Sequence, residues 1–151
     1  MSEGLAASSA VRISEIVAVA TQFDGTAPIS EQAVLNLRSA DVEHRVVESG
    51  GRIVGYAQIQ PGAGDHPAMA EVVVDPESRG RGIGTELVAT ALGLGGRAAR
   101  VWAHGNLAGA QAVAGKLGLV VARELLQMRR PFGEAELPGI DVSAGVVLRT
   151  Y

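Results

Sequence analysis

The sequence predicts an α/β domain in which a mixed β-sheet is flanked by helices. Helical and strand patterns alternate along the chain in the order α-α-β-β-β-α-β-α-β-β, which is typical of a layered α/β fold. At the centre, the β-branched run 71–74 ends at Asp75-Pro76, and helical spacing of apolar residues begins at Ile83. A length of 151 residues is enough for one domain with its own hydrophobic core.

Two helices and a β-hairpin are expected before this centre. After a loose lead-in of residues 1–10, apolar residues at i, i+3, i+4 and i+7 predict an amphipathic helix: Ile13, Ile16, Val17 and Ala20. Ser30 is expected to cap a second helix that runs to about Arg38 and buries Val34, Leu35 and Leu37. Gly50-Gly51 predicts a tight turn between strands 45–49 and 52–60. The second of these strands alternates as a half-buried strand does, and Gly55 is a candidate bulge.

The remaining elements follow the central helix, which Gly95-Gly96 closes. A strand is expected at 100–103, then a short helix capped by Asn106 and ended by Gly118, then one or two strands within 119–128. We assign residues 11–132 to the folded domain and 133–145 to a linker. Residues 146–151 read as the first strand of a second domain.

Composition excludes several function classes. The net charge of -3 gives no broad attraction to nucleic acid or to anionic membranes. The absence of cysteine excludes disulfides, thiolate-ligated metals and thiol catalysis in this chain, and no metal site is expected. No apolar run approaches the roughly 20 residues of a membrane-spanning helix. We therefore expect a cytoplasmic protein without a nucleic-acid or membrane partner.

The segment between the central strand and helix has the features of an anion-binding loop. Glycines alternate through it and end at a helix N-terminus, where free amides and the helix dipole attract negative charge. Arg79 and Arg81 add two cations. The candidate ligand-binding residues are Arg79, Gly80, Arg81, Gly82, Ile83 and Gly84.

Two known phosphate loops do not match this segment. A nucleotide P-loop ends in Gly-Lys-Ser/Thr, whereas this loop ends in Gly84-Thr85-Glu86. A dinucleotide fingerprint reads G-x-G-x-x-G and is followed by an acid, whereas the glycines here read G-x-G-x-G and residues 101–104 contain no acid. A glycine-rich turn that binds no ligand is the remaining alternative, and the two arginines argue against it.

The pattern V-V-x-P-x-x-R-G-x-G-x-G of residues 73–84 resembles the coenzyme A pyrophosphate loop of GNAT-type N-acetyltransferases. The resemblance extends over about residues 11–131 and includes Gly51–Tyr56, Asn106 with Ala110, and Leu117-Gly118-Leu119. Residues 23–28, 101–105, 123–131 and 145–151 further resemble the N-terminal half of the mycothiol synthase family, whose members carry two GNAT domains.

This resemblance implies a GNAT fold with a mostly antiparallel central sheet and acetyl-CoA as the acetyl donor. It places the pantetheine arm against Val72, Val73 and Val74, with Asn106 near it, and the pyrophosphate on loop residues 79–84. The implied acceptor is a small amine, namely the cysteinyl amine of cysteinyl-glucosaminyl-inositol. The implied partner is a second GNAT domain after residue 151.

Several polar residues are candidates for chemistry, and each has a simpler alternative. Glu71 can act as a general base, or its carboxylate is only solvated. Glu31 matches a position linked to the acceptor in the family, or it only places favourable charge at a helix N-terminus. His104 can titrate near neutrality, although a single histidine at a strand end is more often structural. Trp102 and Tyr56 read as core or cleft-wall residues.

One departure from the family pattern bears on catalysis. GNAT enzymes often carry a tyrosine four residues before the glycine of the Leu-Gly-Phe/Leu motif, where it protonates the leaving thiolate. In this sequence that position is Ala114, which cannot donate a proton. Three functions therefore remain open: an acetyltransferase half, a non-catalytic acetyl-CoA-binding module that supports a catalytic partner half, and a stand-alone GNAT enzyme acting on another amine.

Overall fold

The computed structural model describes residues 4–129 together with Gly145 and Val147. The described elements are α1 (Ala7–Asp24), α2 (Glu31–Leu35), η1 (Asn36–Arg38), β1 (Glu43–Ser49), β2 (Arg52–Gln60), β3 (Met69–Val74), η2 (Pro76–Ser78), α3 (Ile83–Gly95), β4 (Arg100–Val101), η3 (His104–Asn106) and α4 (Ala108–Lys116). The predicted linker 133–145 and second-domain strand 146–151 lie outside the described residues, apart from Gly145 and Val147. No helix in the described part of the chain is long and apolar enough to cross a membrane.

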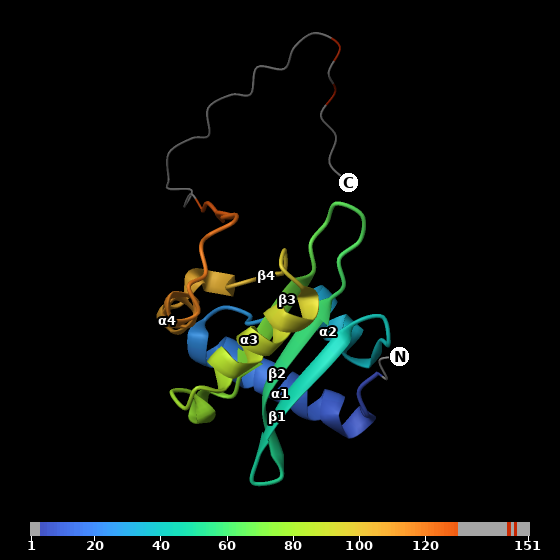
Figure 1. The fold of residues 1–151 in the computed structure, drawn as a ribbon, viewed down its shortest axis with the longest axis vertical. Coiled ribbons are helices and arrows are strands. Elements are labelled where there is room, and N and C mark those ends of the chain that lie inside the picture. Colours follow the sequence, from blue (N-terminus) through green and yellow to red (C-terminus); the bar gives the residue numbers. More distant parts are fainter. Residues whose placement is uncertain (1–3, 130–144, 146, 148–151) are drawn as a thin grey trace.

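The four strands form one mixed sheet in the order β1-β2-β3-β4, with two antiparallel pairs followed by one parallel pair. One hydrophobic cluster joins α1 and α2 to one face of β2 and β3, and a second joins α3 to the other face. Figure 1 shows α1 and α3 on opposite sides of the sheet. The predicted layered α/β architecture with a mostly antiparallel sheet is confirmed.

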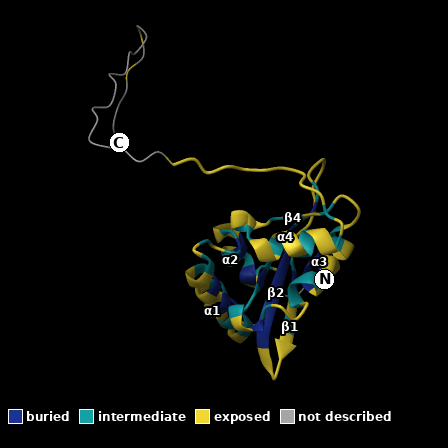
Figure 2. Cartoon of the chain, turned by 90° about the vertical axis from the view of Figure 1, so that its left-hand side faces the viewer, coloured by how far each residue is buried: buried dark blue, intermediate teal, exposed yellow. Residues whose placement is uncertain are grey.

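Strand β2 is the buried centre of this architecture. All residues from 53 to 59 are buried, and Figure 2 shows the strand in dark blue between the helices. The expectation of a half-buried strand was wrong because helices cover both faces of the sheet, so both sets of alternating side chains are enclosed. Gly50 (φ 59°) and Gly51 (φ 74°) make the predicted β1–β2 turn with positive φ at both positions.

The expected irregularity at Gly55 is confirmed, with Val54 as the extra residue. Val47 pairs with Gly55, and the next residue of β1 pairs with Ile53, which leaves Val54 unpaired in the β1–β2 ladder. Gly55 also lies under α3, because an added Cβ there would be 2.8 Å from Ile83 Cγ2 and 3.0 Å from Leu87 Cδ1. Glycine is therefore what allows α3 to pack closely on β2.

The N-terminal helices differ in detail from the prediction. Helix α1 begins at Ala7, so residues 7–10 are not a loose lead-in, and Ala10 is part of the core. Ser30 caps α2 as expected, its hydroxyl accepting the Ala33 N–H at 3.2 Å. Leu35 is 70% exposed, contrary to prediction. Leu37 is buried as predicted, Val34 is partly buried against the core, and Ala33 is buried although it was not predicted to be. Helix α2 becomes the tighter η1 directly after Leu35.

The predictions after α3 were less accurate. Strand β4 contains two residues instead of four, and Asn106 does not cap α4, because the residue at the cap position is Leu107 and no side chain bonds there. Residues 119–129 form no strand, and Val120 is 88% exposed. Figure 2 shows this segment leading away from the domain. A β-branched run has strand propensity, but a strand also needs a hydrogen-bonding neighbour, and none lies beside this segment among the described residues.

Gly55→Ala is expected to lower the free energy of unfolding by about 1–3 kcal/mol, because the added methyl group overpacks the contact with α3. The matched control is Gly93→Ala in α3, where an added Cβ would have no neighbour within 4 Å among the described residues beyond the adjacent backbone of its own helix. This control is expected to raise the free energy of unfolding by about 0.5–1 kcal/mol through helix propensity. Urea denaturation measures both, and equal effects of the same sign would contradict the packing role of Gly55.

Candidate functional site

The candidate site begins where β4 separates from β3. The two strands pair only at Met69 with Arg100 and at Ala70 with Val101. The last backbone hydrogen bond to β3 on this side comes from the Trp102 N–H, which donates to the Ala70 carbonyl at 3.0 Å. The chain then turns into η3. From residue 71 onward, β3 therefore has no strand neighbour on this side among the described residues.

Strand alternation decides which β3 amides face this open edge. Val73 lies opposite Tyr56, and the Asp75 N–H donates to the Val54 carbonyl at 2.9 Å, so the odd-numbered residues bond to β2. The amides of Val72 and Val74 consequently point to the open edge. Only these two of the three predicted β3 residues have an amide available for a ligand, and Val73 is instead a buried core residue.

The glycine loop places a second group of free amides at the end of the same strand. Gly80 (φ 76°) and Gly82 (φ 88°) adopt left-handed conformations, and Gly82 occupies the N-cap position of α3. The first α3 hydrogen bond runs from the Glu86 N–H to the Gly82 carbonyl at 3.0 Å. The amides of residues 83–85 precede this bond and have no backbone acceptor in the described part of the chain. Free amides at a helix N-terminus are the arrangement on which the predicted anion site depends.

The two arginines of the loop have different surroundings. The Arg79 guanidinium donates to both carboxylate oxygens of Asp24, at 2.8 and 2.7 Å, and lies over the Phe23 ring, 5.5 Å from its centroid. This hydrogen bonding lowers the pKa of Asp24 despite burial, so the pair is ionised at neutral pH. Arg79 thus connects the loop to the end of α1, and Arg81 is the exposed cation beside the loop amides.

Glu71 is held by three hydrogen bonds at the start of the open edge. The Ser30 hydroxyl donates to Oε1 at 2.7 Å, the Ser30 N–H donates to Oε2 at 2.5 Å, and His104 Nε2 lies 2.8 Å from Oε2. Burial acts to raise the pKa of Glu71, but the hydrogen bonds from His104 and Ser30 outweigh it and the pKa is lowered. The carboxylate is therefore ionised, and it is not the solvated strand-start carboxylate of the simpler interpretation.

His104 completes a constellation that joins three segments of the chain. Its ring stacks on Trp102 with centroids 6.0 Å apart and planes 22° apart. The contact with Glu71 connects the turn after β4 to β3, and Ser30 adds the start of α2. Sequence reasoning named Glu71 and His104 separately but missed their contact, because partners separated by 33 and 41 positions leave no local pattern.

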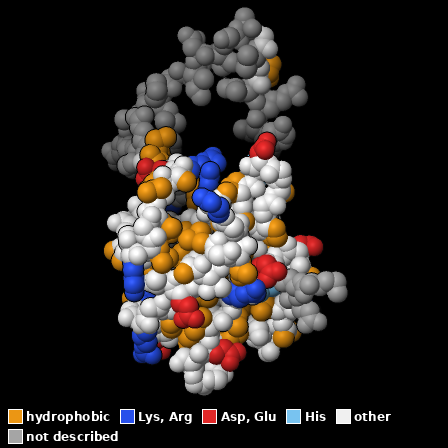
Figure 3. Space-filling model, viewed as in Figure 1, with side chains coloured by type: hydrophobic (Ala, Val, Ile, Leu, Met, Phe, Trp, Pro, Cys, Tyr) orange, Lys and Arg blue, Asp and Glu red, His pale blue; other side chains and the backbone are white. Residues whose placement is uncertain are grey.

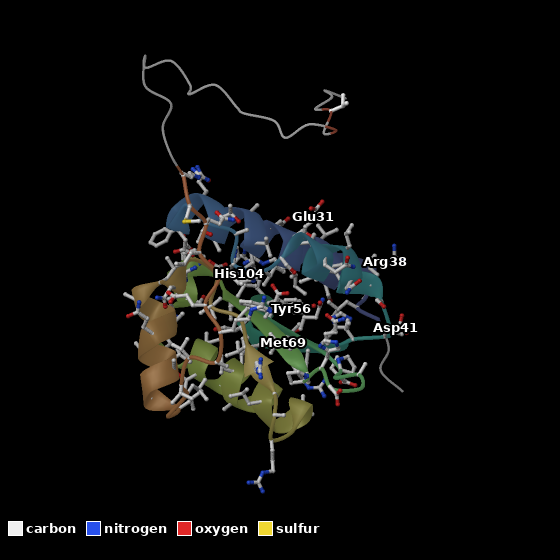
Figure 4. All side chains as sticks on the ribbon, turned by 90° about the horizontal axis from the view of Figure 1, so that it is seen from above. Glu31, Arg38, Asp41, Tyr56, Met69 and His104 are labelled. Atoms are coloured by element: carbon white, nitrogen blue, oxygen red, sulfur yellow. The ribbon has the colours of Figure 1, made fainter. Side chains whose placement is uncertain are left out.

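The other candidate residues are not brought into this constellation. Glu31 is exposed, and Figure 4 shows it on the outer side of the α1–α2 layer, whereas His104 lies between that layer and the sheet. Asn106 is exposed in η3 with φ 46°, and its carbonyl accepts from Gln111 Nε2 at 2.8 Å. Tyr56 is a core residue, as expected, and burial raises the pKa of its hydroxyl to about 12.

Two further observations concern the charge on the surface and the side chains that could bind a metal. On the face shown in Figure 3, Lys and Arg side chains are scattered among acidic and apolar ones and do not form one continuous patch. Within the described residues, no three or more His, Cys, Asp or Glu side chains come together in an arrangement that could hold a metal ion.

Known proteins match both the sequence and the fold. Residues 14–119 match the model of the acetyltransferase (GNAT) family. The mycothiol acetyltransferase of Rhodococcus jostii is 59% identical over 145 residues, which are 94% of this chain and 48% of that protein. The mycothiol acetyltransferase of Nocardia farcinica is 54% identical over 92% of this chain and 46% of that protein. The chain thus spans about half the length of these curated relatives.

Two solved structures share the fold at low sequence identity. An aminoglycoside N-acetyltransferase AAC(6')-Iy in complex with CoA has a TM-score of 0.55 and 15% identity over 80% of this chain and 94% of its own. A phosphinothricin acetyltransferase from Sinorhizobium meliloti in complex with AcCoA has a TM-score of 0.54 and 19% identity over 77% of this chain and 72% of its own. Since the family model covers most of the domain and the fold agrees, the chain belongs to the acetyltransferase (GNAT) family of N-acetyltransferases.

Proposed function

We propose that this domain binds acetyl-CoA along the open edge of β3 and at the N-terminus of α3. We further propose that it is the N-terminal half of a mycothiol acetyltransferase-like enzyme, which acetylates the cysteinyl amine of cysteinyl-glucosaminyl-inositol. The observation that carries the proposal is the continuity of free amides from Val72 and Val74 to residues 83–85. The mycothiol acetyltransferases that match at 59% and 54% identity support the choice of acceptor.

The two groups of amides suit the two chemically different parts of coenzyme A. Free amides at a helix N-terminus bind a pyrophosphate, and Arg81 adds positive charge beside them. Gly82 leaves the approach open, since in the described part of the chain no atom beyond its sequence neighbours lies within 4 Å of an added Cβ. The pantetheine arm carries amide groups and can extend β3 as an added strand would, through Val72 and Val74. An amide at this edge can also polarise the thioester carbonyl.

A second function is favoured by one specific residue. Ala114 lies in α4 where family enzymes often place the tyrosine that protonates the thiolate, and an alanine side chain has no proton to donate. This favours a domain that binds acetyl-CoA and supports a catalytic partner half. A stand-alone enzyme acting on another small amine is the third candidate, and the identity of the acceptor distinguishes it.

Acetyl-CoA is expected to raise the melting temperature of the domain, because a ligand that binds only the folded state stabilises it. A concentration 100-fold above Kd contributes about 2.7 kcal/mol. For a domain of this size, that corresponds to an increase of roughly 5–10 °C. Differential scanning fluorimetry measures it, and no increase at millimolar acetyl-CoA would contradict the binding proposal.

The Gly82→Val variant is expected to lose this increase, because a side chain at φ 88° blocks the pyrophosphate and strains the loop. The control is Gly64→Val in the β2–β3 loop, which also has positive φ (57°) and open surroundings. This control carries comparable backbone strain at a position outside the glycine loop of residues 79–84. It is expected to have a lower melting temperature in buffer but to keep the full increase with acetyl-CoA.

Acetyl transfer by the domain alone is expected at a trace rate, because general acid catalysis is typically worth roughly 10²–10⁴-fold and Ala114 cannot supply it. Mass spectrometry of the N-acetylated cysteinyl pseudodisaccharide measures the rate beside that of the two-domain enzyme. Near-equal rates would refute the view of Ala114 as a defect. An increase in the Ala114→Tyr variant would locate the missing acid, and no increase would point to incomplete acceptor binding.

A further inference from the structure

The contacts of Glu71 close the inner end of the open β3 edge, where the acyl group of a bound donor would lie. We propose that the Glu71 bridge, formed by Ser30, Glu71 and His104, limits the donor to a short acyl group and excludes longer apolar acyl chains. This inference rests on the proposed binding of acetyl-CoA along the β3 edge. It gives the bridge a role in donor selection, separate from any chemical step.

The backbone of β3 determines how far a donor can extend along the open edge. From the α3 N-terminus inward, the outward amides are those of Val74 and then Val72. The next outward carbonyl, that of Ala70, already accepts the Trp102 N–H at 3.0 Å. A pantetheine arm added along β3 therefore has its last backbone partner at Val72, and the acyl group on its sulfur reaches the level of Glu71.

The Glu71 bridge crosses the edge at this level. Glu71 Oε2 lies 2.8 Å from His104 Nε2, so one contact joins β3 to η3 just beyond the point where β4 separates. The Ser30 hydroxyl donates to Oε1 at 2.7 Å and connects the same carboxylate to the start of α2. The His104 ring also stacks on Trp102, which fixes its plane. A chain that extends past Val72 meets this bridge.

The loop between α1 and α2 packs beside the bridge and holds it in place. Gly105, the residue after His104, has φ 72°, and an added Cβ there would be 2.6 Å from Thr26 Cγ2. Glycine thus lets η3 pack closely against the α1–α2 loop. Moving His104 aside to admit a longer chain would require moving that loop as well.

The charge of the bridge opposes an apolar chain as well. Burial acts to raise the pKa of Glu71, but the hydrogen bonds from His104 and Ser30 lower it, so the carboxylate is ionised. Losing one hydrogen bond to a charged group weakens binding by about 10-fold or more. An acyl chain that displaces His104 or Ser30 loses such a bond, whereas an acetyl group ends before it reaches the bridge.

An open apolar tunnel at this place would have the opposite effect on affinity. Each CH₂ group buried in an apolar site strengthens binding by about fourfold. A hexanoyl chain would then bind more tightly than an acetyl group. The direction in which affinity changes with acyl length therefore distinguishes a closed polar end from an open apolar one.

The first test compares donors that differ only in the acyl group. Isothermal titration calorimetry of the 151-residue chain measures Kd for acetyl-CoA, butyryl-CoA and hexanoyl-CoA. Affinity is expected to fall along this series, with hexanoyl-CoA about 10-fold weaker than acetyl-CoA or more. Equal affinities, or tighter binding of hexanoyl-CoA, would overturn the inference.

The second test opens the bridge. In His104→Ala the ring that contacts Oε2 is removed, and the preference for acetyl-CoA over hexanoyl-CoA is expected to fall to within about threefold, because the chain enters the space left by the imidazole. The matched control is His66→Ala, which removes an exposed histidine of the β2–β3 loop and is expected to keep the full preference. An unchanged preference in a folded His104→Ala variant would overturn the role of the bridge.

A third measurement needs no variant and locates the acyl end directly. In the ¹⁵N-labelled chain, the spectra with saturating acetyl-CoA and with saturating CoA are expected to differ at Val72 and at the three residues of the bridge, because only the acetyl group distinguishes the two ligands. Differences confined to the glycine loop, or to segments away from the β3 edge, would overturn the placement of the acyl group beside the bridge.

The outcomes separate this inference from the proposed function. A chain that binds neither acetyl-CoA nor CoA contradicts the proposed function and, with it, the inference. A chain that binds acetyl-CoA and hexanoyl-CoA equally leaves donor binding standing and overturns only the Glu71 bridge as the limit on acyl length.

Discussion

The separation of β4 from β3 after two paired residues is the constraint on which the rest of the site depends. An unpaired strand edge presents free N–H and C=O groups, which natural proteins seldom leave without a purpose. Here the edge carries the outward amides of Val72 and Val74 and leads directly into the glycine loop and the N-terminus of α3. One strand, one turn and one helix terminus thereby present donors to a ligand long enough to contact both parts.

Three polar contacts hold the helical layer against this strand–loop–helix unit. Arg79 binds Asp24 at the end of α1, Arg12 of α1 binds Asp75 at 2.6 Å, and Glu71 binds the start of α2. The carboxylates of Asp24 and Asp75 are only 8% and 15% exposed, so these pairs are screened less than surface pairs are. They hold the loop against the helical layer, and the Arg79 guanidinium, expected to contact the ligand, is engaged with Asp24.

Local patterns predicted much of the fold. The Gly50-Gly51 turn, the Ser30 cap and the central strand, loop and helix follow from residues that act on their own neighbours. Burial of both faces of β2 could not be read from β2, because it depends on two helical layers contributed by distant segments. The strands expected within 119–128 do not form for the same reason, because the β-propensity of a segment does not supply a neighbouring strand to pair with.

In the candidate site too, features set by neighbouring residues were predicted, and contacts between distant segments were not. The glycine loop has a sequence signature because each glycine sets the conformation of the backbone at its own position. The expected ligand, and the strand expected to lie beside it, came from the resemblance to the family. The contact of Glu71 with Ser30 and His104 has no signature, because three segments meet only in the folded sheet. The difference between Val73 and its neighbours also required the β2–β3 register, which sequence alone left undetermined.

Amide hydrogen exchange at single-residue resolution, with and without acetyl-CoA, tests the central claim most directly. Before ligand is added, the Val73 amide should be protected by its bond to β2, whereas Val72, Val74 and residues 83–85 should exchange quickly. Acetyl-CoA should slow exchange at Val72, at Val74 and at the α3 N-terminus together. Protection confined to other segments, such as the β2–β3 loop, or no new protection at saturating ligand, would contradict the account.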